Sequence, residues 1–497
     1  MSGARSTGIA VAALAVNYGA RAVFPVVAHV MCAGDKGCDA AALVGAVASA
    51  FFAGDLLAQA ASKPLVARFG GRRLLIAGAA GLGLTLFAVM LLASGPRMAF
   101  LVAQTGLGFW CGLGYPASHA LLADTVPKAF RASAISFISG ASSVGTMISS
   151  LATPLVVERV GWSAPFAAFA ALSLVVAFVA EAFCPHGSGP GPTAASSSAA
   201  AHPHRNGLNE LRLWLADPLV QALMLAMYAS GVANAFLYSF LPTLFVEVYS
   251  VSLTDLAALI TAAPLANAAV CVLSGIWADR LVGRHGWRTH QCRRLLQSLG
   301  TLLPVLTLAV LAWGGAGLGR NFAAVLVTIW MAAQGFQSGG LTATFHDIGG
   351  KHAGELFAIG NVFSKLAGVG AGQAFIAVVR ISSWETLLSI IAWHYVLSGF
   401  VLISLLSRSD TARCIFAEKR EDDISAEPAA SIADVKTELA SEAAPVTDLD
   451  AASASTALGD AAASASGSSD DGHDERIVAP RRSSKARHHL RAGRSTL

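Results

Sequence analysis

Charged side chains are scarce in this chain of 497 residues. Asp, Glu, Lys and Arg together make up 13% of the sequence, about half of their share in soluble globular proteins. Hydrophobic residues make up 55%, so the composition excludes an ordinary soluble domain and indicates a protein that crosses a membrane many times. The formal net charge is only +4, which gives no indication of a nucleic-acid partner.

Cysteine is also sparse. The seven cysteines are dispersed through mostly apolar sequence, a pattern that excludes a zinc module and a disulfide-rich secreted scaffold. Only Cys32 and Cys38 share a predicted loop, where they form either a small disulfide or two free thiols. The sequence has no phosphate-binding loop, no nucleophile beside a base and no metal-ligand spacing. We therefore expect no enzymatic activity, no cofactor and no metal site.

Long apolar runs fill the chain up to residue 407 and predict membrane-spanning helices. One crossing needs about 20 mostly apolar residues. The first run has no convincing cleavage site, so we expect it to remain as a spanning helix. The predicted helices form two sets of six, at 8–31, 40–62, 72–95, 98–123, 132–157 and 162–184, and then at 217–247, 254–279, 292–314, 321–345, 353–379 and 384–407.

Two polar segments lie outside these runs. Residues 185–216 are rich in Pro, Gly, Ser and Ala and predict a flexible cytoplasmic linker, whose histidines either bind a metal or are simply solvated. The tail 408–497 is predicted to be disordered by its composition. Its basic end contacts anionic lipid or a sorting partner, or is only solvated. The predicted bundles are therefore 1–184 and 217–407.

Basic residues concentrate in the connections after predicted helices 2, 4, 8 and 10, whereas the charges in the other connections nearly balance. Because Arg and Lys accumulate in cytoplasmic loops, both termini are predicted to be cytoplasmic. The longest basic connection lies within 274–300 and contains the pattern G-x-x-x-D-R-x-x-G-R. A worn copy, KPLVARFGGR, occupies 63–72 and indicates that the two halves are related repeats.

Several strings of residues carry a resemblance to a known family. The basic pattern and the six-plus-six arrangement resemble the major facilitator superfamily. The strings GYPASHALL at 114–122, VGW at 160–162, SFLPTLF at 239–245, RRLLQSLG at 293–300 and HDIGGKHAGELFAIGN at 346–361 are similar to its anion:cation symporter branch. That branch includes vesicular glutamate, sialic acid, sodium-linked phosphate and plant plastid phosphate carriers. The similarity covers nearly all of 8–407.

The resemblance implies a fold and a function. The fold is an all-α membrane protein with twelve transmembrane helices in two pseudo-symmetric six-helix bundles. The function is secondary active transport of a small organic or inorganic anion, coupled to H+ or Na+, by alternating access. Two alternatives stay open: a uniporter of a neutral or zwitterionic solute with degenerate coupling residues, and a non-transporting membrane receptor or scaffold that acts through the tail.

This chain departs from the usual pattern of the branch at coupling and substrate positions. In the string NYGAR, Asn17 and Arg21 match the branch, but Ala20 replaces its acidic residue. In predicted helix 4, Gln104 and Cys111 stand where the branch has Arg and Glu. These departures put the branch's usual proton chemistry in doubt.

Four ionisable residues at membrane depth are site candidates, because burying a charge there requires a partner or a water-filled path. Arg21 matches the branch's anion-binding arginine, and it either binds substrate or serves in a structural pair. Asp55 either couples protons or neutralises Arg21 or Lys365. Lys365 either faces Arg21 as the second half of an anion clamp, pairs with Asp55 or reaches the headgroups. His119 either relays protons or is a hydrogen-bonded structural histidine.

Weaker candidates complete the predicted site. Tyr115, Asn234, Tyr238 and Asn361 are polar positions that we expect to orient the substrate. The superfamily pattern further implies a conformational latch at the cytoplasmic ends of the helices, in which an acidic residue pairs with loop arginines and a helix N-terminus. The latch residues are Asp279, Arg280, Gly283, Arg284 and Arg68.

Overall fold

The computed structural model describes residues 2–32, 38–93, 96–126, 131–184, 212, 214–349 and 353–408. Most of the predicted linker and nearly all of the predicted tail, with their histidines and basic end, lie outside the described residues. The first half consists of α1 (Ser2–Cys32), α2 (Ala40–Leu92), α3 (Arg97–Gly112), α4 (Gly114–Thr125), α5 (Arg131–Val160) and α6 (Ala164–Phe183).

In the described residues the second half contains eleven helical elements, of which η2 and η4 are short π-helical segments. The elements are α9 (Pro218–Ala235), η2 (Phe236–Phe240), α10 (Leu241–Tyr249), α11 (Leu253–Gly283), α12 (Thr289–Gly314), the 3-10 turn η3 (Gly315–Leu318), α13 (Arg320–Gln334), η4 (Ser338–Thr342), α14 (Ala343–Gly349), α15 (Ala353–Ile381) and α16 (Trp384–Arg408).

These elements make twelve crossings, as predicted. Nine helical runs in the described part of the chain are long and apolar enough to span a bilayer. One of them, α2, has 53 residues. At 1.5 Å per residue its two parts have a summed length of about 80 Å, enough for two crossings of a hydrocarbon core of about 30 Å. The interrupted pairs α3–α4 and α13–α14 supply the remaining two crossings.

The sequence predicted a break of nine residues, 63–71, between helices 2 and 3, but the break in the structure is shorter. Helical geometry continues through residues 63–69 and is interrupted at Gly70, whose φ of 75° lies in the left-handed region. Glycine adopts this conformation at little cost because it has no Cβ. The reversal of the chain therefore needs only one residue. The structure also interrupts predicted helix 4, at Leu113, between α3 and α4.

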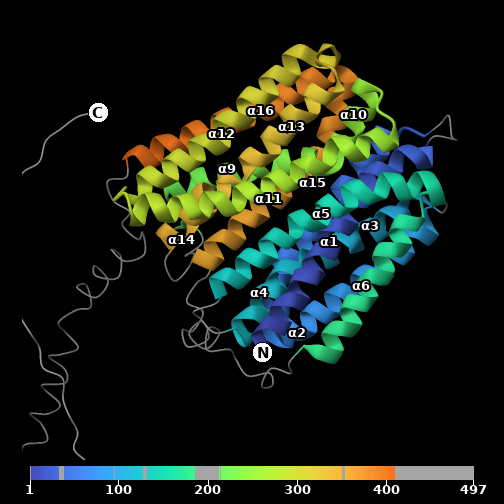
Figure 1. Ribbon diagram of the computed structural model, residues 1–497, viewed down its shortest axis with the longest axis horizontal. Helices are drawn as coiled ribbons and strands as arrows, with labels where there is room; N and C mark the ends of the chain where they lie inside the picture. The colour runs from blue at the N-terminus through green and yellow to red at the C-terminus, as the bar shows by residue number, and fades with distance from the viewer. Residues whose placement is uncertain are drawn as a thin grey trace, which may run out of the picture. The chain divides into compact units, whose positions relative to one another are not determined.

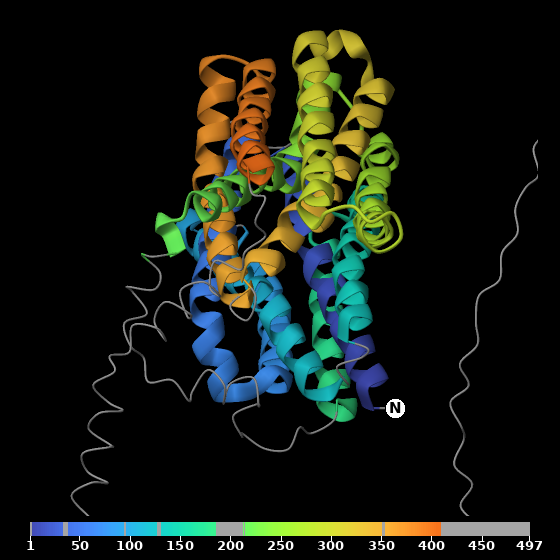
Figure 2. The ribbon, with the colours of Figure 1, turned by 90° about the vertical axis from the view of Figure 1, so that its left-hand side faces the viewer.

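The helices form two bundles. Figure 1 shows α1 to α6, blue to green, beside α9 to α16, green to orange, with α5 against α11. In Figure 2 the same groups appear as a lower and an upper bundle. Because successive crossings alternate in direction, the described ends of the chain, at Ser2 and Arg408, lie on one membrane face, which we name the terminal face. The other is the opposite face.

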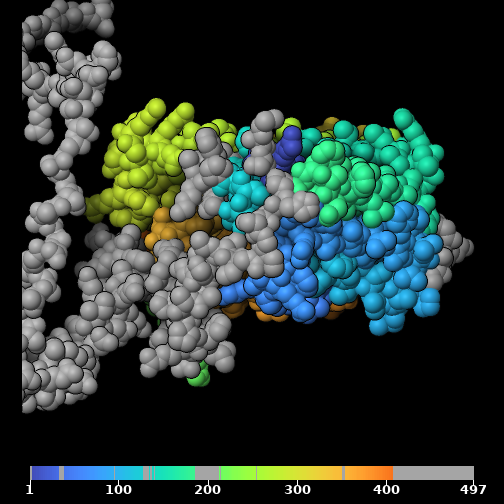
Figure 3. All heavy atoms as spheres, turned by 90° about the horizontal axis from the view of Figure 1, so that it is seen from below, coloured from blue at the N-terminus to red at the C-terminus, as the bar shows by residue number. Residues whose placement is uncertain are grey.

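The outer surface of the first bundle is apolar, as a lipid-facing surface requires. Exposed large side chains include Leu84 and Leu91 on α2 and Leu172, Val175 and Phe178 on α6. Figure 3 shows this surface over α2 and α6, in blue and green.

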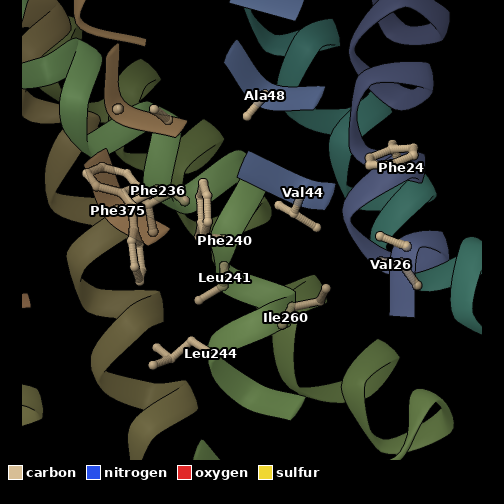
Figure 4. Close-up of a cluster of buried hydrophobic side chains, with 14 of the residues drawn as sticks. Phe24, Val26, Val44, Ala48, Phe236, Phe240, Leu241, Leu244, Ile260 and Phe375 are labelled. Carbon is tan, nitrogen blue, oxygen red and sulfur yellow. The ribbon is translucent and has the colours of Figure 1, made fainter. Parts of the chain in front are cut away.

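The largest apolar cluster joins the two bundles toward the opposite face. It combines the end of α1 and the start of α2 with η2, α10, α11 and α15, and Figure 4 shows Phe24 and Val44 on one side and Phe240 and Leu241 on the other. The other apolar clusters of the described residues each lie within one bundle. The structure is therefore closed by apolar packing on the opposite face.

Candidate functional site

Arg21 lies midway along α1, and its guanidinium is enclosed by aromatic rings. Its central carbon is 4.6 Å from the ring centroid of Tyr238, 4.9 Å from that of Phe52 and 5.1 Å from that of Phe51. These cation–π contacts stabilise the charge. The Nη2 atom is nevertheless buried and has no hydrogen-bond partner among the described residues. Burying a charged donor without an acceptor costs free energy. We therefore expect an acceptor to bind at this Nη2 atom.

The site is built across both bundles. Arg21, Phe51 and Phe52 belong to the first bundle, whereas Tyr238 belongs to η2 in the second. A π-helical turn often occurs at functional positions. The sequence indicated Arg21 and Tyr238 but not the two phenylalanines. Their signal was present in the string FFAGD, which places two aromatic rings one turn before an intramembrane acid.

Asp55 and Lys365 form an ion pair that connects α2 to α15. Lys365 Nζ lies 2.7 Å from Asp55 Oδ2, and the side chains are only 17% and 5% exposed, respectively. The amide of Gln59 contacts the other carboxylate oxygen at 3.4 Å. Of the partners considered from the sequence, Lys365 therefore takes Asp55 in this conformation. Asp55 neutralises Lys365 and not Arg21.

The two charged groups share one region of the molecule. The thiol of Cys111 on α3 lies within electrostatic range of Asp55, Arg21 and Lys365. Asn17, one turn before Arg21 on α1, donates its amide hydrogen to the Cys111 carbonyl over 2.9 Å. Asn17 and Cys111 thus fix α1 against α3 beside the charges.

The other predicted site residues, Tyr115, His119, Asn234 and Asn361, differ in the contacts that they make. Tyr115 donates to Ser142 Oγ over 3.2 Å, and its ring stacks on the exposed His119 with centroids 6.0 Å apart. Asn234 on α9 and Asn361 on α15 are half-buried, and no side-chain hydrogen bond joins either one to another described residue.

Helix α5 contributes hydroxyl groups that the sequence reading missed. Thr146, Ser149, Ser150 and Thr153 recur at helical spacing and are at most 7% exposed. Two of them, Thr146 and Ser150, line a small pocket between the bundles, and this pocket adjoins the Tyr238 ring that Arg21 contacts. The pocket is lined by Ala22, Val26, Thr146, Ser150, Leu237, Tyr238, Leu241, Pro242, Ile260, Pro264 and Met331.

The predicted latch, in which Asp279 pairs with loop arginines, is not formed among the described residues in this conformation. Asp279, Arg280 and Arg284 lie at the terminal-face end of α11, and none of them has an ion-pair partner among the described residues. Arg68 lies over the ring of Phe69, with its central carbon 5.3 Å from the centroid. Gly283 ends α11 and has open space where a Cβ would lie.

Helices α2 and α15 touch along the depth of the membrane. At the terminal face, Lys63 Nζ lies 3.0 Å from Glu355 Oε1, and at the opposite face Asp39 pairs with Arg380. Between them a Cβ on Gly45 would meet the Gly372 carbonyl oxygen at 2.6 Å. Near this seam the structure joins Cys32 and Cys38 in a disulfide, one of the two states that the sequence allowed.

The profile of the Major Facilitator Superfamily matches residues 9–372, which is most of the two bundles. The chain belongs to this superfamily. Membership of this transporter family confirms the predicted fold and agrees with the prediction that the protein is not an enzyme. It also makes the chain a multi-pass integral membrane protein.

The chain is similar to several named transport proteins. The probable chloroplastic anion transporter 4 of Oryza sativa subsp. japonica is 26% identical over 370 residues, which cover 72% of this chain and 61% of that protein. The chloroplastic sodium-dependent phosphate transport protein 1 of Arabidopsis thaliana is 25% identical, with coverages of 74% and 72%. The voltage-gated purine nucleotide uniporter of Homo sapiens is 25% identical, with coverages of 76% and 86%. These relatives agree with the branch inferred from the motifs.

Solved structures show the same fold. The crystal structure of a D-xylose–proton symporter superposes with a TM-score of 0.66 at 15% identity and covers 82% of this chain and 98% of its own. An inward-open xylose transporter of E. coli superposes with a TM-score of 0.60, also at 15% identity, with coverages of 82% and 97%.

Proposed function

We propose that this protein is a secondary carrier of a small anion, which binds at Arg21 between the two bundles. The observation that carries the proposal is the buried Nη2 atom of Arg21, a charged donor that finds no acceptor in the described part of the chain. A planar guanidinium binds carboxylate or phosphate oxygens well because it offers several N–H groups in one plane. The names of the plastid relatives, an anion transporter and a phosphate transport protein, support the same substrate class.

The Asp55–Lys365 pair gives the carrier a way to couple anion binding to a co-ion. In this conformation the carboxylate holds the ammonium. A proton on Asp55 would remove that attraction and free Lys365 to turn to the anion, which would then lie between Lys365 and Arg21. Proton binding and anion binding therefore favour each other. The exposed His119, stacked on Tyr115, lies on α4, which leads to the terminal face, and can pass protons toward the site.

Alternating access requires the bundles to part on one face at a time. The apolar cluster closes the opposite face in this conformation, so the anion would enter or leave at the terminal face. We propose that this face is cytoplasmic, because the basic loops lie there. Asp279, Arg280, Gly283, Arg284 and Arg68 would then engage as a latch only when the terminal face closes. Residues 185–216 would tether the bundles, and the tail 408–497 would bind lipid or a sorting partner.

Uptake into proteoliposomes tests the carrier function. A panel of labelled phosphate, glutamate, ascorbate, sialate and sugar acids is offered under an imposed pH gradient, an imposed sodium gradient or neither. We expect one member to accumulate under a gradient, and we expect Arg21→Met to abolish its uptake. A panel in which nothing enters, or in which Arg21→Met transports normally, would refute the anion site.

The same experiment separates coupled transport from uniport, which the human uniporter among the relatives makes the second candidate. Equilibration without accumulation would identify a uniporter. If proton coupling holds, Asp55→Asn should allow exchange of anion but no pH-driven accumulation. Accumulation driven by sodium alone would remove the proton from the scheme. Normal transport after deletion of 417–497 would exclude a receptor that acts through the tail.

A further inference from the structure

Gln104 lies inside the first bundle with an unused hydrogen-bond donor. It is on α3, only 1% exposed, and its Nε2 atom is buried without a partner among the described residues. Leaving a buried amide donor unpaired costs free energy. A ligand that accepts from this donor would remove that cost.

The register between α1 and α3 places Gln104 at the depth of Arg21. Asn17 contacts Cys111, and the ring of Phe24 lies 5.7 Å from that of Phe100. The two helices are antiparallel, so Arg21 lies between Asn17 and Phe24 just as Gln104 lies between Cys111 and Phe100. Residues 17, 21 and 24 share one face of α1, and residues 100, 104 and 111 share one face of α3. These two faces contact each other at the Asn17–Cys111 hydrogen bond and at the Phe24–Phe100 ring contact.

A second contact connects the same positions through α2. Arg21 lies over the ring of Phe51, and a Cβ on Gly108 would overlap the Phe51 carbonyl oxygen. Gly108 is one turn from Gln104 on α3. The aromatic ring that Arg21 touches is therefore carried on a backbone pressed against the segment that holds Gln104. Two buried donors, Arg21 Nη2 and Gln104 Nε2, have no acceptor among the described residues, and the register of α1 and α3 places them at the same depth.

The charge of the region limits what can accept from both donors. Arg21 contributes one positive charge, and the charges of Asp55 and Lys365 cancel in their ion pair. Gln104 adds a donor but no charge. While this pair is intact, before a proton reaches Asp55, the site that the anion first meets therefore carries a single net positive charge, which one negative charge on the ligand neutralises. A second negative charge would be buried without compensation, at a large cost.

We propose that Gln104 is a specificity-determining residue that selects monoanions, with one carboxylate accepting from both Gln104 Nε2 and Arg21 Nη2. This rests on the proposed function, because it assigns the substrate class of the same site. A monocarboxylate fits the two donors with its two oxygens. The mostly apolar pocket beside Tyr238 would receive its uncharged body.

Matched pairs of ligands test the selection. Succinate, glutarate and phthalate are each compared with their monomethyl esters at pH 7.4, because each ester keeps the carbon skeleton and loses one charge. Affinity is measured as a concentration-dependent thermal shift of the purified full-length protein. We expect the wild type to bind the monoester at least about tenfold more tightly than the dianion in at least one pair.

Substitutions of Gln104 then identify the residue responsible. Gln104→Met keeps the volume and removes the donor, and it should weaken monoester binding about 10- to 100-fold, as expected for a lost hydrogen bond to a charged group. Gln104→Arg adds a charge and should reverse the preference toward the dianion. Gln297→Met is the matched control, since Gln297 is a 4%-exposed glutamine in the second bundle, and it should leave affinity and preference unchanged.

The outcomes separate this inference from the proposed function. Binding that depends on Arg21 but is unchanged in Gln104→Met, or a wild type that prefers dianions, would overturn the monoanion assignment and leave the anion carrier standing. Absence of any binding sensitive to Arg21→Met would overturn both. If Gln104→Met is not recovered as a folded protein, Gln104→Glu replaces it, and unchanged monoester affinity in that variant would overturn the assignment.

Discussion

The Asp55–Lys365 ion pair allows a quantitative test of how the two bundles are held together. At 2.7 Å and an effective dielectric constant of about 20, the attraction between the two charges is about 6 kcal/mol. Both side chains are nearly buried, so each also loses several kcal/mol of hydration. The two terms nearly cancel, and the pair contributes little net stability compared with two neutral residues.

Removing one partner has a different consequence, because the other charge stays buried without compensation. We expect Asp55→Asn and Lys365→Met each to destabilise the protein by about 3 kcal/mol or more. The double variant Asp55→Asn/Lys365→Met should recover most of the wild-type stability. The measurement is unfolding in mixed micelles by SDS titration, with the four proteins arranged as a double-mutant cycle.

The same two helices provide the control. Lys63 and Glu355 form an ion pair of similar length, but their side chains are 75% and 45% exposed. Solvent screens this pair, so its coupling energy in the corresponding cycle should be below about 1 kcal/mol. A double variant at Asp55 and Lys365 that is as unstable as the sum of its single variants would refute the reasoning. Equal coupling energies for the two pairs would do the same.

Two further predictions concern packing and pH. Gly108→Val should destabilise the first bundle by about 3 kcal/mol or more, because the added side chain overlaps the Phe51 backbone. The same change at Gly140, which has open space beside it, should be tolerated. The yield of folded protein in gel filtration is measured for both variants. Partial burial would raise the pKa of Asp39, but hydrogen bonds from the Ala42 backbone and from Arg380 lower it below its usual 3.8. The stability that this carboxylate provides should therefore be complete above pH 4 and be lost as the pH falls through the lowered pKa. Thermal unfolding between pH 3 and 7 should show less loss of stability at the acidic end in Asp39→Asn than in the wild type, and identical profiles would contradict the assignment.

Much of the fold followed from the sequence because a bilayer imposes strong constraints on composition. Runs of about 20 apolar residues have few alternatives to spanning helices, and the predicted segments agree with the structure to within a few residues over most of the chain. The differences are at the start of α1, which begins at Ser2 and not at residue 8, and where one residue interrupts an otherwise helical run, as at Gly70 and Leu113. Hydropathy is averaged over many residues and does not register such local changes.

The sequence by itself also identified which side chains at membrane depth carry charge, because Arg21, Asp55 and Lys365 interrupt apolar runs. Only the tertiary structure decided which of them pair. Lys365 and Asp55 are 310 positions apart, and their contact depends on how α2 and α15 rotate and pack across the two bundles. Gln104 remained a departure from a pattern until the structure buried its amide donor inside the first bundle without a partner among the described residues. A charge in an apolar run can be recognised from the sequence alone. A missing hydrogen-bond partner can be recognised only when the positions of all neighbouring groups are known.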